Sequence, residues 1–209
     1  MADSDHPVWD SVREASRFFM NEGTVHETLR RLADDLAREG ITYAVVGGMA
    51  LFRHGFRRFT EDVDILMTAG ALDQFRDRLV GRGYVPLFPG AAKSFRDTSN
   101  GIRIEVLTTG EFPGDGKPKP VSFPDPGEAS ILRDGFPVVS LPRLIEMKLA
   151  SGLSAPHRMK DITDVGELIV HLDLPLEFDA DLDSSVRDEY RRLWKIMRER
   201  PPDPHEQGP

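Results

Sequence analysis

The segment Tyr43–Met67, YAVVGGMALFRHGFRRFTEDVDILM, is the most informative part of the chain. The apolar run Tyr43–Val46 predicts a buried strand, because a short apolar run bounded by turn residues is typical of a strand inside a sheet. Gly47-Gly48 then predicts a tight turn, followed by a short helix to about residue 54. A second strand is expected over 62–67. This order of strand, turn, helix and strand indicates an α/β (α+β) protein with helices packed on a sheet.

The second strand opens with two carboxylates, Asp62 and Asp64. Residues two apart on a strand point to the same side of the sheet, so these side chains project together while Val63 and Ile65 face the core. Two adjacent carboxylates repel each other unless a proton or a cation lies between them. A hard divalent ion such as magnesium, which prefers carboxylate and phosphate oxygens, is the expected partner at neutral pH.

A third carboxylate, Glu105, lies on another predicted strand, 102–107. Ile102, Ile104 and Val106 share one side of this strand, and Glu105 lies on the other side. If the strand lies beside the one that carries the aspartates, Glu105 joins them. Three carboxylates can hold two metal ions about 3.5–4 Å apart and clamp the attacking and leaving oxygens of a phosphoryl displacement.

The ordered set of Gly-Gly, a spacer, Asp-x-Asp and a later single carboxylate resembles the polymerase-β-type nucleotidyltransferase superfamily. The stretch GGMALFRHGFRRFTEDVDIL, residues 47–66, is more closely similar to the AbiEii-like branch, which includes nucleotidyltransferase toxins of toxin–antitoxin systems. The helix with LIEMKLASG, residues 144–152, and the following RMKDITDV, residues 158–165, strengthen the resemblance, which covers about residues 40–172. It implies a small mixed β-sheet core flanked by helices, with a C-terminal helical lobe.

The resemblance implies a Mg²⁺-dependent (or Mn²⁺-dependent) enzyme that moves a nucleoside monophosphate from an NTP, such as ATP, to a hydroxyl acceptor and releases pyrophosphate. Asp62, Asp64 and Glu105 are then the expected catalytic metal ligands, and general base is the alternative role of Glu105. Gly47 and Gly48 are expected to hold the triphosphate through backbone N–H groups at the start of the short helix. Much of the superfamily has Gly-Ser here, so at Gly48 a hydroxyl that would touch a phosphate is absent.

A second group of candidate nucleotide-binding residues lies on the two predicted helices that follow. Lys148 has apolar neighbours, and a phosphate oxygen is one reason for a lysine there, with snorkelling as the alternative. The resemblance implies that Asp161 orients Lys148 or lines the nucleotide pocket. It also implies that Arg158 and Lys160 contact phosphates or the acceptor. The structural alternative is a helix surface with local ion pairs, Arg158 with Asp161 and Lys160 with Asp164.

The acceptor stays open at this stage. The resemblance implies the 3′ end of tRNA and a cognate antitoxin as partner, and a protein side chain or a small molecule such as an aminoglycoside is the alternative. The net charge of −8 argues against a broad nucleic-acid-binding surface. Arg53, His54, Arg57 and Arg58 form a local basic cluster that would supply a grip. A non-catalytic nucleotide- or partner-binding module is the rival class, favoured by Gly48.

Composition limits the alternatives further. The chain of 209 residues has no cysteine, which excludes a disulfide framework and a cysteine-ligated zinc site. No apolar run approaches the roughly 20 residues that span a membrane. The first residues show no signal peptide. A cytoplasmic location without membrane association is the resulting expectation.

Four regions are expected: N-terminal helices over 1–40 that pack on the core, a nucleotidyltransferase core over 41–140, a helical lobe over 141–200 and a disordered tail over 201–209. Helices are expected over 9–21, 24–39, 71–83, 141–152, 157–172 and 184–199, and strands over 42–46, 62–67, 84–87, 93–96, 102–107, 129–132 and 136–139. Thr24 and Glu27 predict a capping box at the start of the second helix, and Gly40 predicts its end.

Overall fold

The structure is a computed structural model that describes residues 14, 15, 17 and 22–199. The helices are α2 (Thr24–Arg38), α3 (Gly47–Arg53), α4 (Ala69–Leu79), α5 (Pro126–Ala129), α6 (Leu141–Ser154), α7 (Met159–His171) and α8 (Arg187–Glu199), with 3₁₀ helices η1 (Pro156–Arg158) and η2 (Leu176–Asp181). The strands are β1 (Ala44–Val45), β2 (Asp62–Met67), β3 (Tyr84–Pro86), β4 (Ser94–Asp97), β5 (Arg103–Thr108), β6 (Ser130–Arg133) and β7 (Phe136–Val139). Most of the expected helix 9–21 and the whole expected tail 201–209 lie outside the described residues.

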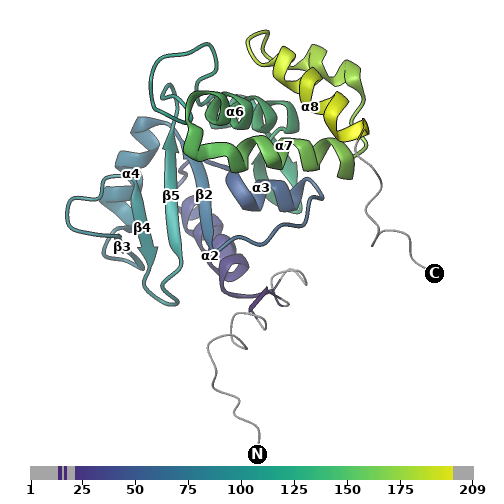
Figure 1. The fold of residues 1–209 in the computed structure, drawn as a ribbon. Coiled ribbons are helices and arrows are strands. Elements are labelled where there is room, and N and C mark those ends of the chain that lie inside the picture. The colour runs from purple at the N-terminus through teal and green to yellow at the C-terminus, as the bar shows by residue number, and fades with distance from the viewer. Residues whose placement is uncertain (1–13, 16, 18–21, 200–209) are drawn as a thin grey trace, which may run out of the picture. The chain divides into compact units, whose positions relative to one another are not determined.

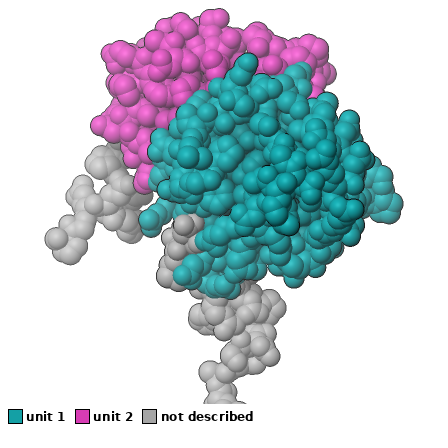
Figure 2. Space-filling view, turned by 180° about the vertical axis from the view of Figure 1, so that it is seen from behind, with its two compact units in different colours: residues 1–110, 123–140 teal, residues 111–122, 141–209 magenta. Residues whose placement is uncertain are grey.

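The chain divides into two compact units, coloured separately in Figure 2. Unit 1 comprises residues 1–110 and 123–140 and contains the sheet. Unit 2 comprises residues 111–122 and 141–209 and contains α6, α7 and α8. The change from sheet to helices therefore falls after Ser140. Sequence patterns gave no sign that the Gly- and Pro-rich segment 111–122 belongs with the later helices.

Unit 1 is built on a seven-stranded mixed sheet with the strand order β3-β4-β5-β2-β1-β7-β6, of which β2, β3, β4 and β5 are labelled in Figure 1. β2 pairs in parallel with β5, and β1 pairs in parallel with β7, while the remaining neighbours are antiparallel. The strand β2 lies in the middle of this order, and its apolar side chains, Val63 and Ile65 among them, are completely buried. Helices α2, α3 and α4 each contact β2. The expected α/β class with a small mixed sheet is confirmed.

Helix α2 forms because Leu29, Leu32 and Leu36 recur at helical spacing, and all three are fully buried. The helix ends as predicted at Gly40, whose φ of 66° lets Ile41 N–H return to the carbonyl of Leu36.

The predicted capping box at the start of α2 is wrong. Thr24 is the first helical residue and follows the N-cap Gly23, so its side chain is one position too late to cap the helix. The Thr24 backbone N–H and hydroxyl both donate to Glu14 Oε1, at 2.7 and 2.8 Å. A carboxylate from outside the helix therefore accepts from the Thr24 N–H, and the Glu27 N–H donates to the Gly23 carbonyl at 3.0 Å instead of to a side-chain cap.

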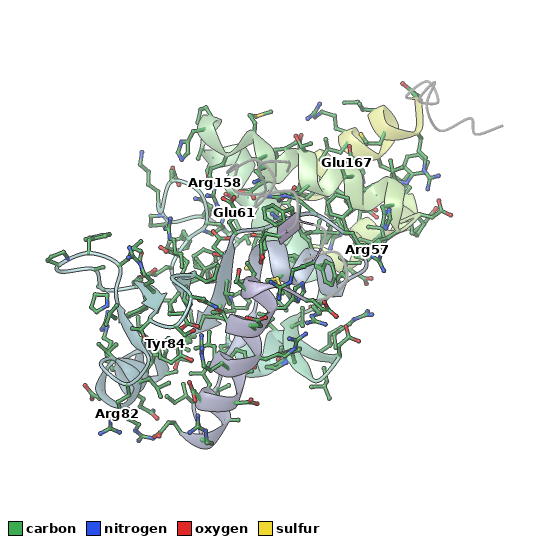
Figure 3. All side chains as sticks on the ribbon, turned by 90° about the horizontal axis from the view of Figure 1, so that it is seen from below. Arg57, Glu61, Arg82, Tyr84, Arg158 and Glu167 are labelled. Atoms are coloured by element: carbon green, nitrogen blue, oxygen red, sulfur yellow. The ribbon has the colours of Figure 1, made fainter. Side chains whose placement is uncertain are left out.

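The edge of the sheet is tied to α2 by a buried tyrosine. Tyr84 of β3, labelled in Figure 3, donates its hydroxyl proton to Asp35 Oδ2 at 2.7 Å. Burial raises the pKa of Tyr84, which keeps the phenol protonated as a donor. This bond holds the β3 end of the sheet against the helix that covers it.

Unit 2 is a helical assembly in which α6 packs on α7 and α7 packs on α8. The segment 111–122 is bound to α6 through Lys119, whose ammonium donates to Asp115 Oδ1 at 2.6 Å and to Ser154 Oγ at 3.1 Å. None of the described helices is long and apolar enough to cross a membrane.

Most predicted elements are present, and two differ clearly in extent. The first strand is limited to Ala44–Val45, and the helix expected over 71–83 runs from Ala69 to Leu79. Gly81 and Gly83 both have positive φ values, of 83° and 115°, and this explains why the helix ends before them. The 3₁₀ helix η2 lacked a periodic apolar pattern and was not expected.

Candidate active site

The pairing of β2 with β5 brings the three predicted carboxylates to one side of the sheet. In this parallel register Asp62 lies opposite Arg103, and Asp64 lies opposite Glu105. Asp62, Asp64 and Glu105 are half-buried, whereas Val63, Ile104 and the other apolar side chains between them are buried. The expectation that Glu105 lies on the strand beside the aspartates is therefore confirmed.

The turn before α3 is shaped around Asp64. Gly47 has a φ of 60°, which side-chain-bearing residues rarely adopt. A Cβ at Gly47 would overlap the Asp64 carboxylate, including Oδ2. The turn is also joined to β2 by the Val46 N–H, which donates to the Asp64 carbonyl at 3.0 Å. The glycine therefore allows the carboxylate to lie directly against the turn.

Both oxygens of Glu105 accept hydrogen bonds. Ser94 of β4 donates to Oε1 at 2.8 Å, and Arg103 donates to Oε2 through Nε at 2.9 Å and Nη2 at 2.7 Å. The hydrogen bond to Glu105 raises the pKa of Arg103, and the charges of Glu105, Asp62 and Asp64 raise it further, against a smaller opposing effect of burial. Arg103 is thus the cation that balances the carboxylates in this structure.

The carboxylates fit a divalent cation only in part. Asp62 and Asp64 supply hard oxygen donors on one side of β2, and the absence of a side chain at Gly47 lets the Asp64 carboxylate lie against the turn. Glu105 would have to exchange its bond to Arg103 for a metal ion. Across the described part of the chain, no three His, Asp or Glu side chains are arranged to hold one metal ion as they stand. The three-ligand site is therefore a prediction that depends on a side-chain rearrangement.

Unit 2 contains the other predicted group, gathered around a buried lysine. Lys148 of α6 donates to Asp161 Oδ1 at 3.0 Å and to Asp164 Oδ2 at 2.7 Å, both on α7. The side chain of Lys148 is only 9% exposed. Snorkelling to solvent is therefore wrong as an explanation, because the ammonium is neutralised inside unit 2. These two bonds use two of its three N–H donors.

Asp161 is the centre of this group. Its Oδ2 accepts from Ser151 at 2.7 Å and from Arg158 Nε at 3.1 Å. Burial alone would raise the pKa of Asp161, but the positive charge of Lys148 and the bonds from Ser151 and Lys148, with Arg158 nearby, hold that pKa below its usual value. The predicted contact between Asp161 and Lys148 and the predicted Arg158–Asp161 ion pair are present.

The predicted pair of Lys160 with Asp164 is wrong. Asp164 is buried and bonds to Lys148, which lies on a different helix, whereas Lys160 is exposed. Ser151 was not singled out from the sequence, because a serine in an apolar helix gives no pattern of its own. It lies three residues after Lys148, and this spacing on one helix face was the available signal.

Two residues of the basic cluster formed by Arg53, His54, Arg57 and Arg58 are buried and so cannot contact an acceptor as the sequence suggested. The Arg53 side chain is 3% exposed, bonds to Asp134 Oδ2 at 3.1 Å and lies over the ring of Phe136 at 4.8 Å. His54 is buried, and its Nε2 lies 2.8 Å from the Val139 carbonyl oxygen. The expectation that Arg53 would grip an acceptor is therefore wrong, since its charge is already neutralised in the core.

Two charged residues of the loop between α3 and β2 are exposed to solvent. Arg57 and Glu61, both labelled in Figure 3, are exposed, and Arg58 is half-buried. Their opposite charges explain why this loop is not a strongly basic surface.

The chain is only distantly similar to known proteins. No protein-family model matches the chain, and no curated protein matches it. Among solved structures, JHP933 from Helicobacter pylori is similar at 14% identity and a TM-score of 0.46, covering 86% of this chain and 91% of that chain. MenT4, a nucleotidyltransferase toxin from Mycobacterium tuberculosis, is similar at 13% identity and a TM-score of 0.38, covering 92% and 90%. These values assign neither a family nor an activity to this chain.

The Lys148–Asp161 pair predicts a pH-dependent stability. The pKa of Asp161 is lowered from 3.8, so the pair stabilises the folded state above that value, and the contribution is lost as the pH falls through the lowered pKa. We expect Asp161→Asn to reduce the free energy of unfolding by about 1.5–3 kcal/mol at neutral pH and by much less in acid. Urea denaturation between about pH 7 and about pH 3 measures this difference.

Asp188→Asn is the matched control, because Asp188 pairs with Arg191 on the surface and its side chain is 97% exposed. Its effect on stability should be small at every pH. A stability loss in Asp161→Asn that stays constant across the acid range would contradict the ionised pair.

Proposed function

We propose that this chain is a metal-dependent nucleotidyltransferase, which moves a nucleoside monophosphate from an NTP to a hydroxyl acceptor with release of pyrophosphate. The observation that carries the proposal is the register of β2 with β5, which gathers Asp62, Asp64 and Glu105 beside the Gly47 turn. The fold does not require three half-buried carboxylates on one face of the sheet. A solvent-facing surface could be formed by fewer carboxylates placed further apart.

The chain's own residues would act as follows. Asp62 and Asp64 would bind Mg²⁺ or Mn²⁺, and the backbone N–H groups of Gly47 and Gly48 would hold the triphosphate. The bound cation would neutralise the charge that develops on the phosphate oxygens during in-line attack. Glu105 becomes either a further metal ligand or the base that accepts the proton of the acceptor hydroxyl. Both roles require Arg103 to leave Glu105 Oε2.

We propose Lys148 as a phosphate ligand, held in its orientation by Asp161 and Asp164. Arg158 and Lys160 are both exposed and remain candidates for contacts to phosphate or acceptor.

The acceptor is proposed at the level of class. The resemblance of the 47–66 segment to toxin-type enzymes favours the 3′ end of tRNA, with growth inhibition as the result and an antitoxin as the natural partner. Burial of Arg53 reduces the local positive charge available for RNA. A small hydroxylated acceptor, such as an aminoglycoside, remains the second candidate.

A non-catalytic nucleotide-binding module is the rival, and one observation favours it. Both oxygens of Glu105 already accept hydrogen bonds, from Ser94 and Arg103, so a metal ion would have to compete for this carboxylate. The rival predicts NTP binding that yields no product.

Label transfer distinguishes the two. Wild-type protein with Mg²⁺ and each α-³²P NTP should transfer label to one fraction of a cell extract: RNA, protein or small molecules. We expect Asp64→Asn to reduce transfer by at least about 100-fold, because it removes a charged ligand from the reacting centre. Asp77→Asn is the control, since Asp77 is an exposed aspartate of α4 in the same unit. Equal transfer by Asp64→Asn and wild type would contradict the proposal.

Arg103 gives a second prediction. Removing its charge frees Glu105 and makes the local potential more negative, so Arg103→Gln should bind Mn²⁺ about fivefold more tightly than wild type. Titration monitored by electron paramagnetic resonance measures the affinity without any turnover. Arg82→Gln, at an exposed arginine outside the site (Figure 3), is the control for net charge. Weaker Mn²⁺ binding by Arg103→Gln would show that Arg103 supports the site rather than competes with the ion.

A further inference from the structure

Thr60 lies two residues before Asp62 and is buried at 8% exposure. Its hydroxyl donates to Asp62 Oδ1 at 2.7 Å. A hydroxyl that donates to a carboxylate fixes the rotation of the carboxyl group. The bond therefore holds Oδ1 of Asp62 against Thr60 and fixes the orientation of Oδ2.

The position of Thr60 also explains the second glycine of the turn. A Cβ at Gly48 would lie 2.7 Å from both Cβ and Oγ1 of Thr60, and 3.1 Å from Cγ2. Gly48 lies in α3 without a positive φ, so the requirement for glycine is one of space and not of backbone conformation. The Thr60 side chain occupies the volume that a side chain at position 48 would need.

The two glycines thus serve different carboxylates. Gly47 makes room for Asp64 itself, and Gly48 makes room for the threonine that holds Asp62. We propose that Thr60 is a positioning residue of the active site, which orients Asp62 for cation binding from the space left open by Gly48. The inference rests on the proposed function, because it gives Asp62 the role of metal ligand.

Groups that orient a metal ligand through a hydrogen bond change metal affinity or activity by about 10–100-fold when they are removed. Thr60→Val keeps the shape that fills the space over Gly48 and removes the hydroxyl. We expect Mn²⁺ affinity and kcat to fall by about 10–100-fold, with KM for the NTP nearly unchanged. Thr60→Ser restores the hydroxyl and should stay within a few-fold of wild type in both measurements.

Mn²⁺ titration without NTP or acceptor separates this inference from the proposed function. If wild type binds Mn²⁺ and Thr60→Val binds it equally well, Thr60 does not orient Asp62 and the inference is overturned. If wild type and Asp62→Asn show the same absence of Mn²⁺ binding, the proposed function fails, and the inference fails with it. Loss in Thr60→Val together with rescue in Thr60→Ser supports the inference.

A double-mutant cycle tests the coupling of Thr60 to Gly48. Gly48→Ala should lower the melting temperature by about 5 °C, because the new methyl group meets Thr60. In a Thr60→Gly background the same change should cost much less, since the space is then vacant. An equal cost of Gly48→Ala in both backgrounds would overturn the claim that Thr60 occupies this space.

Discussion

The parallel pairing of β2 with β5 is the constraint on which the candidate site depends. Side chains alternate along each strand, so a shift of one residue in this register would move Glu105 to the opposite side of the sheet from Asp64. The register is held by buried apolar residues on the other side, including Ile65 and Ile104. The core therefore determines the geometry of the carboxylates through the strand pairing.

Charge balance is the second constraint. Three carboxylates on one face repel one another, and the structure offsets this repulsion with Arg103. The proposed function requires a divalent cation to take over part of that role, so Arg103 and the cation compete for Glu105. Unit 2 balances its buried charge differently, because Asp161 and Asp164 both accept hydrogen bonds from the Lys148 ammonium. Such a buried group is costly to disturb once one partner is removed.

The sequence predicted those features that follow from local periodicity or from an ordered motif. Alternation along 62–67 and 102–107 identified both carboxylate strands, and helical spacing identified α2. The sequence did not predict contacts between residues that come together only in the folded chain. The burial of Arg53 requires Asp134 and Phe136 from a distant hairpin, and the short first strand has only two paired residues.

The same limit explains the residues that were missed or misjudged in the candidate site. Arg103 was not singled out from the sequence, because its charge affects the aspartates only once β2 lies beside β5. Thr60 gave no signal, since its role depends on Gly48 across the turn. From the sequence, Gly48 was interpreted as the loss of a serine hydroxyl. In the structure, glycine is required there because the Thr60 side chain occupies the space that a side chain would need.

A crystal structure with Mn²⁺ and a non-hydrolysable NTP analogue, using the anomalous signal of manganese, tests the central claim most directly. We expect a manganese peak coordinated by Asp62 and Asp64, with the triphosphate against the Gly47 turn and Arg103 turned away from Glu105. A bound analogue whose manganese lies away from both aspartates, or an unchanged Arg103–Glu105 bond beside an empty carboxylate face, would contradict it.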